Sequence, residues 1–482
     1  MDSYPNRISA SMLQVIISVF FAALLSLLFW KLFSSPGSDS QIQVQSKKLE
    51  RNFFWAVHDF DHDNFSENVY FKYEPNSERW GIKISHYDES IIDQWNLPEP
   101  WFRQAIFGDF DNDLWDELYF FTYTEDSLFL WAIDPRHRNR FLLQRQLMAV
   151  APNPLPPGAS RWDINDINGT LLDCDGDGFK DLVLSFYTGF ALQPRCLLTY
   201  SIKKQKVLQQ TPPLGIGGLG APQVFQPPGR TIPIIVLNRN YATDNYTQSI
   251  PLRDDRAWLI AFSPELKFLF PPVAFPPVFS YVSVKPVLFS TTPYLVVLHT
   301  VSSPSNQPRI LYLYTLDGQE VTRRQLSRDF DWYISSLPTG RFNRLYLSNN
   351  QGSLQLLDEQ LHTVKEFHFP HPLKTFLAEG DFDGDLENEY CFESQGGVVI
   401  LETDFEAEYF YPLQLSYPIK TYHFLQGEDV HQLLLWTSEQ SYLLRYTLNP
   451  HAKLLQLIPI LLFLLLSTGI YLVLRSQQQR RL

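Results

Sequence analysis

Apolar runs of strand length recur along the chain, and a turn-rich polar stretch precedes each one. Four of these runs follow acidic loops that begin at residues 59, 109, 173 and 381. Others follow stretches that begin at residues 221, 285, 337 and 424, which are rich in turn residues but lack the acids. Short runs rich in β-branched and aromatic residues between turn signals predict strands, and helical heptads are not evident. The pattern therefore predicts an all-β protein built from eight similar units.

The clearest loop has the sequence DCDGDGFKD and places acids at loop positions one, three, five and nine: Asp173, Asp175, Asp177 and Asp181. This alternation suits a hard divalent cation, because every second side chain of a tight loop turns inward. The backbone carbonyl of Phe179, at position seven, is a further expected ligand. Gly178, at position six, allows the positive φ that a sharp turn requires. An EF-hand would place its last acid at position twelve, before a helix. We therefore expect a Ca²⁺ loop between two strands.

The same spacing occurs three more times, and the expected ligands are Asp109, Asp111, Asp113 and Glu117; Asp381, Asp383, Asp385 and Glu389; and, in a weaker copy, Asp59, Asp61, Asp63 and Glu67. A single acidic loop is more often a solvated turn, but the repetition favours metal sites. Position six holds Leu114 and Leu386 in two loops, which is awkward for positive φ, and Asn64 in another, which tolerates it better. His58 and His62 flank the weakest loop as alternative transition-metal ligands or as ordinary turn residues.

These loops resemble the DxDxDGxxD loops of FG-GAP or VCBS-type repeats in integrin-like β-propellers. Residues 51–449 are covered by the resemblance, which implies a seven- or eight-bladed β-propeller with calcium in its blades. Two stretches, GFALQPRCLLTYSI and DDRAWLIAFSPELKFLF, look like the same family in the extracytoplasmic sensor regions of bacterial membrane histidine kinases.

Composition agrees with a large β-rich domain. Aromatic residues make up 15% of the chain, and there are 34 Pro against 22 Gly. The net charge of −13 argues against a nucleic-acid partner, because phosphate binding needs a basic face. Calcium ions bound at the four loops would neutralise much of this charge.

Two uncharged apolar runs flank the repeats and are long enough to cross a bilayer. We expect membrane helices at 12–33 and 454–474, with a flexible linker at 34–50. A cleaved signal peptide is the alternative for the first run. Basic residues beside the spans place the tails, 1–11 and 475–482, in the cytoplasm. The chain is therefore expected to be a multi-pass cell-membrane protein whose propeller is extracytoplasmic, either periplasmic or extracellular.

The expected function is ligand binding or sensing by a membrane-anchored, calcium-binding propeller. Its partners would be a protein or small ligand on the propeller and a separate cytoplasmic signalling protein, since the eight-residue tail cannot be a kinase. The chain could also be the input half of a split or truncated kinase. A cell-surface adhesion or protein-interaction role is the main alternative. No GxSxG, HExxH or phosphate-loop motif occurs, so we do not expect an enzyme.

Overall fold

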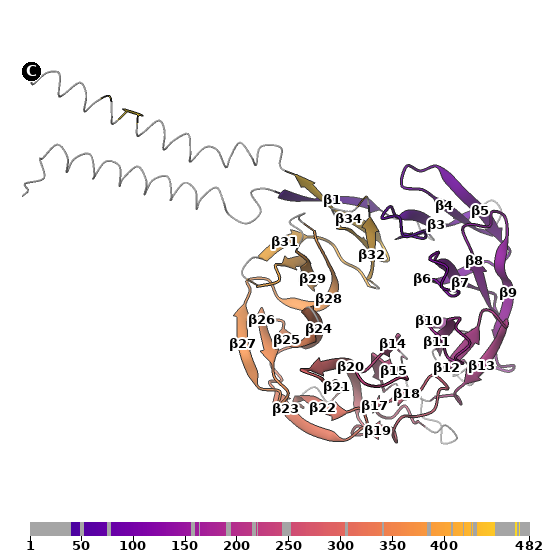
Figure 1. The fold of residues 1–482 in the computed structure, drawn as a ribbon. Coiled ribbons are helices and arrows are strands. Elements are labelled where there is room, and N and C mark those ends of the chain that lie inside the picture. The colour runs from indigo at the N-terminus through magenta and orange to yellow at the C-terminus, as the bar shows by residue number, and fades with distance from the viewer. Residues whose placement is uncertain are drawn as a thin grey trace, which may run out of the picture.

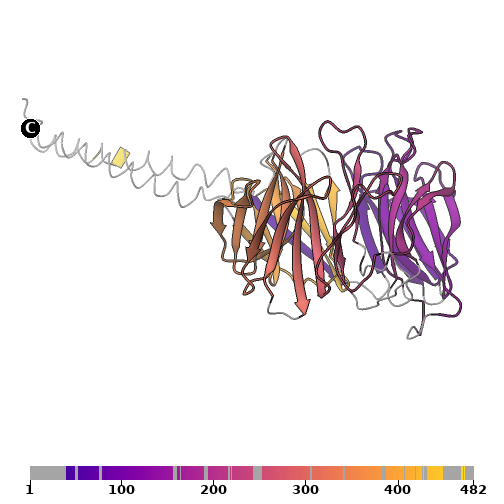
Figure 2. The same ribbon diagram turned by 90° about the horizontal axis from the view of Figure 1, so that it is seen from below.

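The described part of the chain forms a β-propeller of eight blades arranged as a closed ring (Figure 1). A second view shows that the strands run along the thickness of this ring (Figure 2). The computed structural model describes residues 40–48, 53–74, 79–155, 160–162, 164–188, 194–214, 218, 220–242, 252–303, 307–339, 342–382, 387–405, 408–417, 419–425, 427, 431–448, 468, 469 and 472.

The first three blades are four-stranded antiparallel sheets that follow one another along the chain. Blade 1 consists of β2 (Phe53–His58), β3 (Glu67–Glu74), β4 (Arg79–Ser85) and β5 (Ile91–Leu97). Blade 2 consists of β6 (Trp101–Gly108), β7 (Glu117–Tyr123), β8 (Ser127–Ile133) and β9 (Phe141–Val150). Blade 3 consists of β10 (Ile164–Leu172), β11 (Asp181–Thr188), β12 (Arg195–Ser201) and β13 (Lys206–Gln210).

The next two blades are less regular. Blade 4 consists of the sheet β14 (Pro222–Phe225), β15 (Ile234–Leu237) and β18 (Ala261–Phe262), beside the pair β17 (Trp258–Leu259) and β19 (Val273–Ala274). Blade 5 consists of β16 (Arg239–Tyr241), β20 (Phe279–Phe289), β21 (Thr292–Ser303), β22 (Arg309–Thr315) and β23 (Glu320–Leu326).

The last three blades return to four strands. Blade 6 consists of β24 (Trp332–Thr339), β25 (Phe342–Asn349), β26 (Ser353–Leu357) and β27 (Thr363–His368). Blade 7 consists of β28 (Leu373–Gly380), β29 (Glu389–Ser394), β30 (Gly397–Leu401) and β31 (Glu408–Pro412). Blade 8 consists of β32 (Lys420–Leu425), β33 (His431–Trp436), β34 (Gln440–Leu448) and β1 (Ser40–Lys48). The eight units expected from the sequence are confirmed, and the blade number is eight.

Each pair of neighbouring blades shares a hydrophobic core, so the described residues contain eight clusters around the ring. A blade is therefore covered on both faces, and middle strands such as β11, β12, β29 and β30 are buried at every position rather than at alternate ones. Strand β11, with the sequence DLVLSFYT, is buried along its whole length. This two-sided burial explains why the strands appear in the sequence as continuous apolar runs.

Strand β1 closes the ring by pairing antiparallel with β34, with Val44 opposite Leu444. This corrects the expected linker at 34–50, since residues 40–48 of it form an edge strand of blade 8. The Ser- and Gln-rich composition resembles a linker, but Ile42 and Val44 alternate with glutamines, as in an edge strand with one apolar face. The propeller begins at residue 40 and not at 51.

The prediction of two membrane spans, and with it the multi-pass membrane localisation, is wrong by the structure. No helix in the part of the chain that the structure describes is long and apolar enough to cross a membrane. A span needs a continuous helix of about 20 residues, which an apolar run in the sequence does not by itself provide. The expected segment 12–33 lies outside the described residues, as does 454–474 except for the helical residues Thr468, Gly469 and Leu472.

Candidate functional site: the acidic loops

The four acidic loops occupy the same place in four blades, between the first strand and the second. They connect β2 to β3, β6 to β7, β10 to β11 and β28 to β29. In each loop the ninth residue is also the first residue of the second strand, so the last acid is fixed by the ladder of the sheet. The prediction that these loops lie between strands, unlike an EF-hand, is confirmed.

The three fully described loops share one backbone conformation. Positions four and six have positive φ in all three, with angles of 56° and 66° at His62 and Asn64, 60° and 72° at Asn112 and Leu114, and 73° and 83° at Gly176 and Gly178. The expected difficulty for leucine at position six is therefore overcome in the second loop. The Leu114 side chain is 71% exposed, and its N–H donates to Asp109 Oδ2 at 3.2 Å.

The first acid of each fully described loop acts as an internal cap. Both oxygens of Asp173 accept backbone hydrogen bonds, from Gly176 N–H at 2.7 Å and Gly178 N–H at 3.0 Å. Asp109 accepts the equivalent two bonds, from Asn112 and Leu114, and Asp59 accepts bonds from Asp63 and Asn64. Aspartate at position one therefore orders the turn in the three fully described loops, which explains the residue type without requiring a metal.

The ninth acid links the two ends of each loop, because one of its oxygens accepts the N–H of position two. The pairs are Phe60 to Glu67 at 3.0 Å, Phe110 to Glu117 at 3.1 Å, Cys174 to Asp181 at 3.1 Å and Phe382 to Glu389 at 2.5 Å. The fourth loop thus has the same hydrogen bond between its second and ninth residues. Asp383 and Asp385 of this loop lie outside the described residues. Asp381 is also described and is buried.

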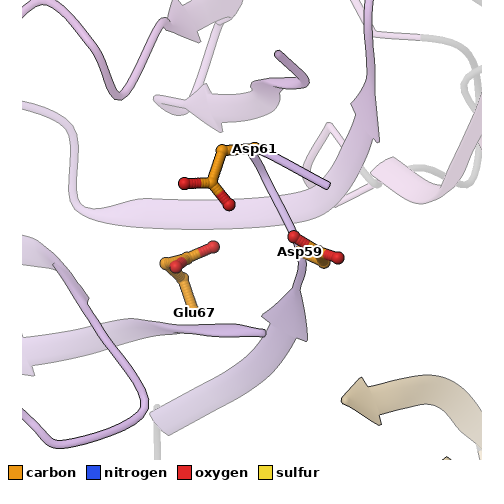
Figure 3. Close-up of side chains that lie close together, drawn as sticks. All are labelled: Asp59, Asp61 and Glu67. Carbon is orange, nitrogen blue, oxygen red and sulfur yellow. The ribbon is translucent and has the colours of Figure 1, made fainter. Parts of the chain in front are cut away.

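Carboxylates converge in three loops, where one oxygen from each of three acids lies within 4.8 Å of the others. The groups are Asp59, Asp61 and Glu67; Asp109, Asp111 and Asp113; and Asp173, Asp175 and Asp181. Figure 3 shows the first group, with the three carboxylates gathered at the end of β2. The remaining expected ligands, Asp63, Glu117 and Asp177, stand outside these groups.

Residues at positions five and seven are hydrogen-bonded to each other. Asp177 Oδ1 accepts the N–H of Phe179 at 3.1 Å, and Asp63 and Asp113 accept the equivalent bonds from Phe65 and Trp115. The backbone carbonyl of Phe179 stays a predicted ligand. The side chain of Phe179 makes a cation–π contact, since Lys203 Nζ lies 3.6 Å from its ring centroid.

Burial makes these carboxylates costly to ionise without a cation. It raises the pKa of Glu67 to about 7 and that of Glu117 to about 8. Burial, followed by repulsion from neighbouring acids, also raises the pKa of Asp61 and Asp111. Asp111 Oδ1 and Glu117 Oε1 are buried and have no hydrogen-bond partner among the described residues. A cation among the converging acids of the second loop would offset the burial of Asp111.

Basic side chains reach two of the loops, which the sequence pattern did not indicate. Lys204, in the turn between β12 and β13, contacts Asp175 and lies 3.0 Å from Asp177 Oδ2. Arg136 contacts Asp113 in the second loop. Lys204 therefore places a tethered positive charge beside the third loop, which has the best sequence match to a calcium site. Only the contact between two turns of blade 3 reveals it, because lysines are common in surface turns.

His58 and His62 bind a carboxylate from the next blade. Their Nε2 atoms lie 2.6 Å and 3.4 Å from the two oxygens of Asp116. Despite its burial, Asp116 has a lowered pKa because of these two partners. This arrangement favours a clamp between blades 1 and 2 over the alternative of a transition-metal pair.

No family model matches this chain, and no curated protein matches it. Solved structures with a similar fold include BBS1N in complex with ARL6DN, soaked with mercury. It is 10% identical with a TM-score of 0.39, and the match covers 84% of this chain and 96% of that one. BamB from Moraxella catarrhalis is 8% identical with a TM-score of 0.36, covering 84% and 99% of the two chains.

A further similar structure is the quinohemoprotein alcohol dehydrogenase ADHIIG from Pseudomonas putida HK5, at 10% identity and a TM-score of 0.47, covering 84% of this chain and 76% of that one. At such identities and TM-scores, these similarities carry no inference about the ligand or activity of this chain. The assignment as an eight-bladed β-propeller rests on its own strand order.

Proposed function

We propose that this protein is a calcium-stabilised β-propeller that serves as a binding module, with its metal loops of the FG-GAP or VCBS type. The observation that carries the proposal is the repeated loop geometry, in which converging carboxylates sit on one shared backbone conformation. The buried oxygens of Asp111 and Glu117, which have no partner among the described residues, give the second loop the strongest demand for a cation.

Calcium suits these loops better than softer metals. It takes six to eight oxygen ligands in flexible geometry, and the converging groups supply carboxylate oxygens alone. Three carboxylates do not fill the coordination shell of calcium, so the backbone carbonyl at position seven and water molecules would complete it. Bound ions would fix the crossing from the first strand to the second in blades 1, 2, 3 and 7.

The loops should differ in their affinity for calcium. In the third loop it must displace Lys204 from Asp175 and Asp177, whereas in the first loop no Lys or Arg contacts the three converging acids among the described residues. We therefore propose that the first loop binds calcium more tightly than the third, the reverse of the order that the sequence match to DxDxDGxxD favours. In the second loop Arg136, which contacts Asp113, is a similar competitor.

Binding, and not catalysis, is the role we propose for the propeller as a whole. The fold is a general protein-interaction module, and the clustered acids are largely engaged in holding their own loops. The partner would be a protein or a small ligand. Sensing of that ligand is favoured over adhesion by the two sensor-like stretches of sequence, one of which supplies β12 and the other β17 and β18.

The test is thermal unfolding of the full chain in EGTA, in CaCl₂ and in MgCl₂, with bound calcium counted by elemental analysis after gel filtration. Each site filled to 100 times its Kd stabilises the fold by about 2.7 kcal/mol. We expect a calcium-specific rise in Tm with at least two ions retained. An unchanged Tm in millimolar calcium, with no ion retained, would refute the proposal.

A further inference from the structure

A cavity of about 1500 Å³ lies at the centre of the ring. Its walls come mainly from the first strands of four consecutive blades, β32, β2, β6 and β10, which face the middle of the ring in Figure 1. None of the described residues of the acidic loops contributes to this lining. The cavity is therefore a separate feature from the calcium loops.

Lys420, on β32, holds its ammonium group in this cavity against uncharged groups. Its Nζ donates to Gln104 Oε1, which is its only hydrogen-bond acceptor among the residues that the structure describes. The same atom lies 5.2 Å from the ring centroid of Phe54 and 6.0 Å from that of Trp436. A neutral amide and two aromatic faces compensate an ammonium ion only in part.

A second cation, Arg103 on β6, faces the same cavity. Its Nε donates to the carbonyl of Ile164 at 3.4 Å, and its guanidinium lies 5.2 Å from the ring centroid of Tyr123. Burial lowers the pKa of Lys420 to about 8; Asp166 opposes this shift and Arg103 adds to it. Both cations therefore face one cavity, where burial disfavours the charged form of Lys420.

The net charge of the cavity is opposite in sign to that of the protein. Among the residues that the structure describes, its charged lining residues are Lys48, Arg103, Lys420, Asp166 and Glu439, three cations against two acids. Asp166 already accepts a hydrogen bond from Asn168 Nδ2 at 3.0 Å. A surplus of positive charge on the inner wall of a chain with a net charge of −13 indicates a site for negative charge.

We propose that the central cavity binds a small organic anion, with its carboxylate or phosphate between Arg103 and Lys420. The body of the ligand would be apolar or aromatic, because Phe54, Phe102 and Trp80 line the same wall. Arg and Lys together supply the charged donors that such a group requires. This cavity proposal rests on the proposed function as a binding module, for which it names a class of ligand. It does not depend on calcium in the loops.

The first test titrates the full chain with phenyl phosphate, benzoate and inorganic phosphate at pH 6.5. Binding is measured by tryptophan fluorescence and by the heat of binding in calorimetry. Trp80 and Trp436 line the cavity and report occupancy. We expect the two aromatic anions to bind more tightly than inorganic phosphate, and their ratio shows whether a phosphate or a carboxylate is preferred. Saturable binding by none of the three at millimolar concentrations would overturn the proposal.

Variants then locate the site. Lys420→Met and Arg103→Gln should each raise the Kd for phenyl phosphate about tenfold, the loss expected for one charge-assisted hydrogen bond. Asp166→Asn should lower it severalfold, a gain that misfolding cannot produce. Lys365→Met, on the outer strand β27, is the matched control and should bind as the wild type does. Equal affinities in all four variants would overturn the assignment.

Labelling of the wild-type chain gives a second readout that needs no variant. Pyridoxal phosphate is an aromatic anion whose aldehyde condenses with a neutral amine, losing water, and borohydride then reduces the imine to a stable secondary amine. We expect Lys420 to be the first lysine labelled and phenyl phosphate to protect it. Labelling elsewhere with Lys420 unmodified would overturn the proposal, whereas the calcium titration of the loops would be unaffected by either result.

Discussion

Glu117→Gln tests the electrostatics of the second loop most directly. The glutamate is fully buried, and its pKa is raised from its ordinary value of 4.5 to about 8. At 1.36 kcal/mol per pH unit, ionising it in the metal-free fold costs about 5 kcal/mol as an upper bound. Because the folded-state pKa is the higher one, its stabilising contribution is complete below about pH 4.5 and is lost as the pH rises through 8.

Glutamine is neutral at every pH and keeps an oxygen for the N–H of Phe110, as Glu117 Oε2 does at 3.1 Å. It also buries an amide group where Glu117 Oε1 has no partner in the part of the chain that the structure describes, at a cost of about 1–3 kcal/mol. In EGTA at pH 9 we therefore expect the variant to exceed the wild type by about 2–4 kcal/mol in free energy of unfolding. At pH 5 this advantage should disappear, and in calcium it should reverse.

Urea unfolding at pH 5, 7 and 9, in EGTA and in CaCl₂, measures these differences. Glu99→Gln is the matched control, since Glu99 is also buried but lies 2.6 Å from Arg145 Nε, outside the loops. It should destabilise the protein by about 1–3 kcal/mol equally with and without calcium. The reasoning fails if Glu117→Gln is the less stable protein in EGTA at pH 9, or if it keeps the full calcium response.

Three further predictions address other elements. Lys204→Met removes the tethered cation from the third loop and should raise the calcium affinity of that loop about tenfold, measured by calorimetry; an unchanged affinity would contradict the competition. Leu114→Gly relieves a positive φ at an exposed position and should raise the free energy of unfolding by about 1 kcal/mol, whereas Gly178→Leu should lower it by a similar amount in the same denaturant titration. Val44→Asp should weaken the closure of the ring by about 2 kcal/mol in urea unfolding, and the exposed Gln45→Asp should change stability by less than about 0.5 kcal/mol; equal effects would mean that β1 does not contribute to closure.

The sequence by itself determined the acidic turns and the buried strands, because both depend on residues close together in the chain. The position-one aspartate, such as Asp173, binds backbone N–H groups within the next five residues, so its spacing predicts the turn directly. Continuous apolar runs such as that of β11 follow from burial on both faces of a blade. These two signals, repeated along the chain, were sufficient for the eight units and for the placement of the acidic loops between strands.

The tertiary structure decided whatever depends on residues far apart in the chain. Strand β1 exists because β34, some 400 residues later, offers an unpaired edge, and a short polar segment has no such partner until the ring closes. Lys204 reaches Asp175 from another turn of blade 3, and Lys420 and Arg103 share a cavity only because blades 8 and 2 line it together. Charge interactions act through space with no fixed spacing in sequence, so neither the competition at the third loop nor the cationic cavity left a pattern along the chain.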